Sequence, residues 1–219
     1  MRNAERGADA QHAQWQRTYA NRPDFFGESA SEPARAALAR FEVAGVRNLL
    51  ELGSGQGRDT LLFLAAGLQV TALDYAGDGL EQIADKAYAA GTADAISLMP
   101  ADVRVALAVE NASFDACYSH MLFSMELTTS ELEALAAEVR RLVRPGGLVV
   151  YTVRTTSDSH FGAGVNHGDD MFEMGGFIVH FFDQELIERL ASGFELLDVA
   201  EYEEGRLPRR LFAVTMRRP

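Results

Sequence analysis

The sequence predicts an α/β fold, a doubly wound and mostly parallel sheet with helices on both faces. Short apolar runs alternate with amphipathic helical segments along most of the chain, at the spacing of βαβ units. The last two apolar runs, 194–202 and 210–216, are joined by a link that is too short for a crossover helix. The final strand should therefore run antiparallel to its neighbour. A chain of 219 residues without repeats fits a single domain.

Two helices are expected ahead of the first strand. The first carries three ring side chains at helical spacing: His12, Trp15 and Tyr19. It should span 10–23 and end at Pro23. The second should begin after the cap residue Ser31, carry Pro33 in its first turn and end at Gly45.

The remaining elements alternate regularly. The expected strands, in chain order, are 46–52, 68–74, 95–102, 114–121, 148–153, 194–202 and 210–216. The expected helices lie in the segments 60–67, 78–91, 128–147 and 183–192. Asp78 and Glu81 are spaced as a capping box for the second of these helices. The stretch between the fifth strand and the last helix is rich in glycine and is expected to form a long loop.

Composition excludes several classes of protein. The net charge of −12 repels phosphate backbones, so we expect no nucleic-acid partner. No stretch approaches the roughly 20 apolar residues that span a bilayer, and the first residues lack the apolar segment of a secretory signal. The single cysteine, Cys117, permits no internal disulfide and no cysteine-based metal cluster. A cytoplasmic protein without a membrane partner is the simplest expectation.

A glycine-rich turn follows the first expected strand. Gly53, Gly55 and Gly57 stand at alternate positions in ELGSGQGRDT, and such costly backbone freedom indicates a tight turn or a close approach to a ligand. Ligands of doubly wound sheets bind at the carboxyl ends of the strands. Asp74 ends the next strand, 21 residues beyond Gly53, where a carboxylate can hold the two hydroxyls of a ribose. The ligand is therefore expected to be a nucleoside-type cofactor.

Two such cofactors are common, a nicotinamide dinucleotide and S-adenosylmethionine. The turn favours the second, because a dinucleotide turn reads G-x-G-x-x-G, whereas this one reads G-x-G-x-G after Glu51. Here the sequence resembles the class I S-adenosylmethionine-dependent methyltransferases. ELGSGQG matches the first motif of that family, LDYA its ribose-binding strand end, PADV its adenine loop and LVRPGGLVVYTV the entry into its fifth strand. The resemblance implies a Rossmann-like fold, with S-adenosylmethionine as cofactor and S-adenosylhomocysteine as product.

The resemblance also implies which residues meet the cofactor. They are Glu51, Gly53, Ser54, Gly55, Gly57, Arg58, Asp74, Tyr75, Asp102, Val103, Ser119 and His120. The turn 53–55 would meet the methionine part and Asp74 the ribose. Asp102 would accept a hydrogen bond from the adenine amino group, beside Tyr75 and the backbone N–H of Val103. Ser119 and His120 would lie near the sulfonium.

The acceptor side should come from the parts that the shared core lacks, the N-terminal helices and the glycine-rich insertion. The residues expected at the acceptor are Trp15, Tyr19, Phe26, Arg154, His160 and His167. The candidates for catalysis are His120, His167 and Tyr19, since a poor nucleophile needs a general base. A plain loop whose polar groups hold its own turns remains the alternative for the insertion. Its histidines show no recognised metal-ligand spacing, so no metal site is expected.

These expectations describe one methyltransferase domain in four parts. They are an N-terminal helical cap (1–44), a cofactor-binding core (45–155), a lid-like insertion (156–181) and a closing helix with two strands (182–219). The expected reaction is transfer of a methyl group to a small-molecule nucleophile by in-line displacement.

Several alternatives stay open. The segments WQRTY and FDACYSHMLFSM are similar to the tellurite-resistance and thiopurine methyltransferases, which act on soft sulfur, selenium or tellurium nucleophiles and small molecules. A non-catalytic protein that binds S-adenosylmethionine is one rival, and a protein or RNA methyltransferase is another. A nicotinamide oxidoreductase is disfavoured by the glycine spacing. The acceptor atom and the oligomeric state are open.

Overall fold

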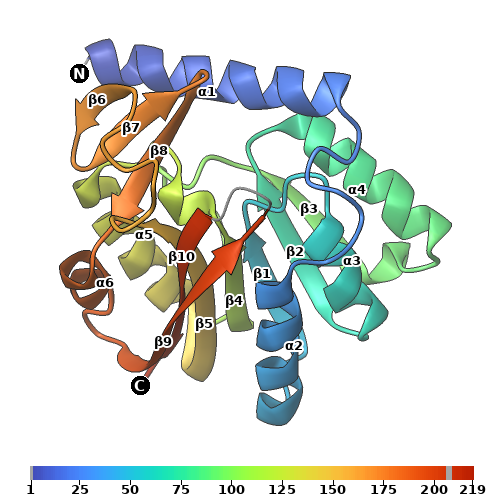
Figure 1. The fold of residues 1–219 in the computed structure, drawn as a ribbon. Helices are drawn as coiled ribbons and strands as arrows, with labels where there is room; N and C mark the ends of the chain where they lie inside the picture. The colour runs from blue at the N-terminus through green and yellow to red at the C-terminus, as the bar shows by residue number, and fades with distance from the viewer. Residues whose placement is uncertain (1, 206–208) are drawn as a thin grey trace.

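The structure, a computed structural model, describes residues 2–205 and 209–219 (Figure 1). Its helices are α1 (Arg2–Asn21), α2 (Glu32–Ala44), α3 (Arg58–Ala65), α4 (Gly77–Ala89), α5 (Thr129–Leu142) and α6 (Gln184–Leu190), with 3₁₀ turns η1 (Ala93–Ala95) and η2 (Leu122–Ser124). Its strands are β1 (Asn48–Leu52), β2 (Gln69–Asp74), β3 (Ile96–Pro100), β4 (Phe114–His120), β5 (Val143–Thr155), β6 (Val165–Gly168), β7 (Met171–Met174), β8 (Phe177–Phe182), β9 (Glu195–Glu204) and β10 (Arg209–Arg217).

The main sheet has the strand order β3-β2-β1-β4-β5-β10-β9. Strands β1 to β5 pair in parallel, while β10 pairs antiparallel with both β5 and β9. The predicted doubly wound α/β sheet with an antiparallel last strand is therefore confirmed. The link between β9 and β10 is too short for a crossover helix. Part of that link, 206–208, lies outside the described residues.

Two apolar layers cover the sheet. Helices α2, α3 and α4 pack on one face, where Phe41 and Phe63 are fully buried. Helices α5 and α6 pack on the other face, around Leu135. Successive residues of β1 serve the two layers in turn, since Leu49 belongs to the first and Leu50 to the second. This alternation is what a strand buried on both faces requires.

The glycine-rich insertion is not the plain loop that the sequence predicts. It forms an antiparallel meander of β6, β7 and β8, and β8 then pairs in parallel with the end of β5. Gly175 and Gly176, with φ of 60° and 85°, make the two-residue turn between β7 and β8. Asp169 and Asp170, with φ of 49° and 54°, take the same place between β6 and β7. Positive φ at both central residues gives the turn geometry that matches the twist of a hairpin. The glycine-rich composition, which predicts a loop, is therefore compatible with hairpin turns.

Smaller differences concern helix ends. Helix α4 starts after Ala76 without a side-chain cap, so the capping box expected from Asp78 and Glu81 is wrong. A complete capping box occurs instead at α5, where Thr128 and Glu131 cap each other's backbone. The second helix has the predicted limits, with Ser31 as cap and Gly45 in the left-handed region. Helix α1 begins earlier than the sequence predicts.

Helix α1 lies across the upper end of the sheet, over the β6–β8 meander on one side and α4 on the other (Figure 1). Gln11 Nε2 donates to Gly176 O at 2.8 Å, which ties α1 to the β7–β8 turn. His12 Nε2 lies 2.9 Å from Tyr75 O, which ties it to the end of β2. Helix α1 therefore covers the carboxyl ends of the parallel strands. Within the described part of the chain, no helix has the length and apolar character needed to cross a membrane.

Candidate active site

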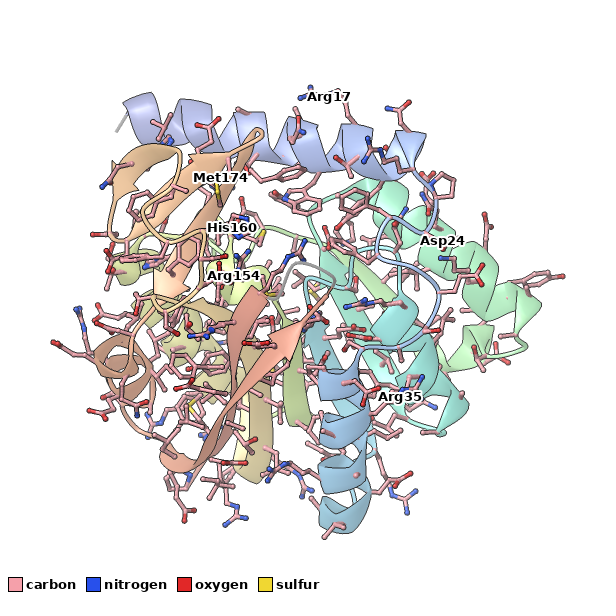
Figure 2. The ribbon with its side chains drawn as sticks, viewed as in Figure 1. Arg17, Asp24, Arg35, Arg154, His160 and Met174 are labelled. Carbon is pink, nitrogen blue, oxygen red and sulfur yellow. The ribbon has the colours of Figure 1, made fainter. Side chains whose placement is uncertain are left out.

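A cavity of about 760 Å³ lies beneath α1 at the carboxyl ends of the parallel strands. Its wall combines the turn after β1, the ends of β2 to β5, α1 and the β7–β8 hairpin. Figure 2 shows Met174 below α1, with His160 and Arg154 beneath it. The volume falls within the range of small-molecule sites, about 300–1,000 Å³. The position is the one where doubly wound sheets bind their ligands.

The glycine turn brings bare backbone to this wall. Gly53, Gly55 and Gly57 have φ of 72°, 55° and 86°, the left-handed region that favours glycine. The N–H of Gly53 donates to Leu73 O at 2.8 Å, which pins the turn to β2. A Cβ on Gly53 would lie 2.8 Å from Leu122 Cβ. The turn therefore has no room for a side chain at this position.

Asp74 stands at the end of β2 and is buried on the cavity wall. Its Oδ2 accepts the N–H of Gly55 at 2.8 Å, and its Oδ1 accepts the N–H of Ala76 at 2.9 Å. Burial raises the pKa of this carboxyl, while the backbone donors oppose the rise. Each oxygen of a carboxylate has two acceptor positions, so Asp74 can hold the turn and two ligand hydroxyls together.

Glu51 lies near the end of β1 and is 3% exposed. Thr60 Oγ1 donates to its Oε2 at 2.6 Å. Burial raises the pKa of Glu51 to about 8, and the charges of Asp59 and Asp74 act in the same direction. A cation on this part of the wall would favour the ionised form. The protonation state of Glu51 should therefore depend on the charge of the ligand in the cavity.

Replacing Glu51 with Gln should change how stability depends on pH. The pKa of Glu51 is about 8 in the folded protein and 4.5 as its ordinary value. Between about pH 5 and about pH 8 the folded state therefore binds more protons than the unfolded state. The free energy of unfolding of wild type should fall across this window, by at most about 1.4 kcal/mol per pH unit. Glu51→Gln lacks that loss, so its free energy of unfolding should rise relative to wild type. Urea unfolding across this window measures the difference, and a constant difference would contradict the shifted pKa.

One end of the cavity holds the residues expected around an adenine. The rings of His12 and Tyr75 lie 4.8 Å apart between centroids. Asp102 and Val103 line the same wall. Arg104 pairs with Asp102, its Nε donating to Oδ1 at 2.9 Å, and this pairing lowers the pKa of the Asp102 carboxyl. Asp102 thus lines the cavity, but its carboxylate already accepts hydrogen bonds from a neighbouring side chain.

The other end of the cavity is largely aromatic. Trp15 packs against Phe177 at 4.8 Å and against Phe26 at 6.0 Å between ring centroids. Tyr19 is buried between this cluster and the glycine turn, because its ring lies 5.4 Å from that of Trp15 and its hydroxyl faces Gly55. Burial raises the pKa of Tyr19 well above its ordinary value, so its hydroxyl keeps its proton. Rings at these spacings form a pocket for a flat or apolar molecule.

Polar groups face the aromatic cluster. His120 Nδ1 lies 2.8 Å from Thr152 Oγ1, and its Nε2 lies 3.5 Å from Glu204 Oε1. The contact with His120 lowers the pKa of Glu204. Both His120 and Glu204 line the cavity. A histidine held between a hydroxyl and a carboxylate is an arrangement able to move a proton.

Arg154 forms a second polar group on this side. Its Nε donates to Asp158 Oδ2 at 3.0 Å, and its Nη2 lies 3.0 Å from His160 Nδ1. The guanidinium carbon also lies 5.3 Å from the centre of the Phe181 ring. Arg154 is 5% exposed, and both Arg154 and His160 line the cavity. Arg154 and His160 are therefore held in place on the wall, and Asp158 largely balances the positive charge of Arg154.

Three predicted site residues lie off the cavity wall. Ser119 is 1% exposed, and its Oγ donates to Leu52 O at 3.0 Å inside the sheet. His167 lies on the partly exposed side of β6, where its Nε2 contacts Glu173 Oε2 at 3.0 Å. Gly57 stands at the start of α3. The structure thus brings neither the Ser119 nor the His167 side chain to the site.

Sequence reasoning missed several residues of the wall. Gln11, Glu126, Glu204 and Arg209 all line the cavity. Gln11 has a local signal, since it precedes His12 on a helix whose ring side chains were already expected at the site. The other three come from segments that only the folded sheet brings to this edge.

A family model described as a methyltransferase domain matches residues 49–147. A malonyl-[acyl-carrier protein] O-methyltransferase from Erwinia billingiae is 33% identical over 114 residues, which cover 52% of this chain and 41% of that protein. The segment 49–147 is therefore similar to a methyltransferase domain, as the sequence motifs predict. The matched segment spans less than half of the Erwinia protein.

Solved structures of methyltransferases have the same fold. The 1,6-didemethyltoxoflavin-N1-methyltransferase of Burkholderia thailandensis, solved with 1,6-didemethyltoxoflavin and S-adenosylhomocysteine, aligns with a TM-score of 0.75 and 22% identity, covering 96% of this chain and 88% of that one. TehB from Haemophilus influenzae aligns with a TM-score of 0.67 and 18% identity, covering 84% and 62%. At these identities the likeness shows the fold alone. The finer resemblance to the tellurite-resistance and thiopurine methyltransferases stays a prediction.

The cavity wall fits S-adenosylmethionine, the cofactor that the sequence predicts. Ser54 Oγ is buried on the wall and has no hydrogen-bond partner among the described residues. Beside it, the glycine turn leaves open backbone, and Asp74 keeps free acceptor positions. An orphaned hydroxyl, bare backbone and a carboxylate suit the carboxylate, ammonium and ribose of the donor respectively.

Proposed function

We propose that this protein transfers a methyl group from S-adenosylmethionine to a small-molecule nucleophile. The observation that carries the proposal is the continuity of the cavity, which extends from the glycine turn and Asp74 to the aromatic cluster beneath α1. A protein that only bound the cofactor would need the first half alone. The open second half is what an acceptor requires, and its volume suits a small molecule rather than a polymer.

In this proposal the first half of the cavity fixes the donor. S-adenosylmethionine supplies a methyl group that is already activated by the positive sulfur, so alignment of the two reactants is the main task. Asp74 holds the ribose hydroxyls, and the Ser54 hydroxyl donates to the methionine carboxylate. The carbonyl oxygens of the glycine turn accept the ammonium, beside which Glu51 ionises. Tyr19, whose hydroxyl keeps its proton, faces the turn at Gly55 and can donate a hydrogen bond there. Together they set the direction from which the methyl group faces the second half.

The second half would bind and orient the acceptor. Trp15, Phe26 and Phe177 offer ring faces for a flat or apolar acceptor, and such faces also steady a positive sulfur by roughly 0.5–2 kcal/mol. In this proposal helix α1 acts as the cap and the β6–β8 meander as the lid, and together they would exclude water from this half. His120 and Glu204 stand where a proton would leave a hydroxyl or amine acceptor.

A non-catalytic binding protein is the alternative from another class. It predicts cofactor binding with no turnover on any acceptor. The pairing of His120 with Thr152 and Glu204 on the wall of the second half favours catalysis, because a site for binding alone does not need a proton carrier there. A protein or RNA acceptor is disfavoured by the roof that α1 forms over the cavity.

The proposal is tested in two steps. Calorimetric titration with S-adenosylhomocysteine should give micromolar binding, while NADH in parallel should give none. Transfer from S-adenosylmethionine labelled in its methyl group is then screened over thiols, selenite, tellurite, phenols and aromatic amines. His120→Ala should lower turnover on a hydroxyl or amine acceptor by about 100-fold or more at unchanged S-adenosylhomocysteine affinity, whereas His167→Ala, off the cavity, should match wild type. Binding without transfer to any acceptor would favour the non-catalytic alternative.

A further inference from the structure

The carboxylate expected to receive the adenine amino group is already occupied. Asp102 Oδ1 accepts the backbone N–H of Arg104 at 2.9 Å and its Nε at 2.9 Å, and Oδ2 accepts its Nη2. These bonds close a small loop within the segment after β3 and hold the Asp102 carboxylate toward Arg104. The same contacts lower the pKa of Asp102, as expected for a carboxylate whose charge is satisfied.

A second carboxylate on this wall is not satisfied. Glu126 follows the turn η2 and lines the cavity. Its Oε2 is buried and has no hydrogen-bond partner among the residues that the structure describes. A buried polar atom without a partner is costly, and native proteins usually explain such an atom by a ligand, a water or strain.

Glu126 interacts electrostatically with groups at the adenine end of the cavity. Burial raises the pKa of Glu126, while the positive charges of Arg104, beside Asp102, and of His167, on β6, oppose the rise. The charge of Glu126 in turn raises the pKa of Tyr75, next to the ribose-binding Asp74. Glu126 shares the cavity wall with Tyr75, Asp102 and Arg104, and it is within electrostatic range of this part of the wall, where the adenine is expected.

We propose that Glu126, rather than Asp102, accepts the hydrogen bond from the exocyclic amino group of the cofactor's adenine. This inference rests on the proposed function, because it takes S-adenosylmethionine as the ligand. The 6-amino group is the one exocyclic donor of adenine, and the unpartnered oxygen of Glu126 is an acceptor. The same oxygen disfavours hypoxanthine, whose 6-oxo group is itself an acceptor and would meet it with like polarity.

Binding of two ligands to three proteins tests the assignment. The ligands are S-adenosylhomocysteine and S-inosylhomocysteine, which carries hypoxanthine in place of adenine, and the readout is the ratio of their dissociation constants by calorimetry. Wild type should prefer the adenine ligand by about tenfold or more. E126Q should reduce this preference to about threefold or less, because an amide both donates and accepts. D94N, a charge-matched control on the exposed turn η1 outside the cavity, should keep the preference of wild type.

The ratio is measured within each protein, so a general loss of stability or affinity does not imitate the result. E126A should lose the preference as E126Q does, and it serves where E126Q does not fold. A preference that survives in E126Q and E126A, or that disappears equally in D94N, would overturn the assignment. A wild type that binds both ligands equally would also overturn it. If wild type did not bind S-adenosylhomocysteine at all, the proposed function itself would be refuted, and this outcome is distinguishable from a failure of the Glu126 assignment alone.

Discussion

Asp74→Ala should weaken binding of S-adenosylhomocysteine by about 1–3 kcal/mol, which is about five- to 150-fold. The carboxylate has two tasks in the structure, since it accepts the N–H groups of Gly55 and Ala76 while its remaining acceptor positions face the cavity. Alanine leaves both backbone donors without their partner and also removes the proposed contact with the ribose. Calorimetric titration of wild type and variant gives the two dissociation constants directly.

Asp94→Asn is the matched control for this change. Asp94 lies on the exposed 3₁₀ turn η1, so its substitution removes one negative charge and touches no cavity residue. Its affinity should equal that of wild type. Equal affinity of Asp74→Ala and wild type would remove Asp74 from the binding site and leave it as a support of the glycine turn alone. A separate thermal unfolding measurement reports that supporting role, because the lost backbone bonds should lower the stability of the free protein.

The sheet could be predicted from the sequence because its signals are local. Apolar runs and the cap Ser31 each act within a few residues, and the alternation of strands and helices follows from such signals. The β6–β8 meander could not be predicted in the same way. Its turns at Asp169–Asp170 and Gly175–Gly176 have the composition of a loop. They become hairpin turns only because the flanking strands pair, which is a property of the folded chain.

The site divides along the same line. Asp74 and the glycine turn belong to one βαβ unit, so a spacing along the chain is enough to bring them together. Glu204 reaches His120 only because β9 and β10 fold back beside β5. Asp102 and Arg104 are close in sequence, and their side chains pair locally. Whether a carboxylate binds such a neighbour or a ligand depends on side-chain packing, which no sequence motif specifies. For this reason Glu126 has no sequence signal at all.

Gly79→Ala should disturb the glycine turn from the opposite side. A Cβ at position 79 would lie 2.3 Å from Gly55 O and 3.1 Å from Tyr19 Cδ2. Neither neighbour can yield freely, because one is backbone of the turn and the other belongs to a buried ring. Either α4 must move away from the turn or the turn must move into the cavity. Overpacking of this kind costs about 1–3 kcal/mol of stability.

The added methyl group should also reduce affinity for S-adenosylhomocysteine, since Gly55 lies on the wall that the cofactor would occupy. Gly77→Ala, two residues earlier in the same helix, provides the comparison. Its Cβ would meet nothing nearer than Gln16 Nε2 at 4.0 Å. This variant should bind as wild type does and be unchanged or about 0.4–1 kcal/mol more stable, because alanine restricts the unfolded chain more than glycine does. Thermal unfolding and calorimetry on both variants separate the two cases. If Gly79→Ala behaved like Gly77→Ala, the close packing of α4 on the turn would be refuted, and with it the view that this helix sets the position of the cofactor's methionine end.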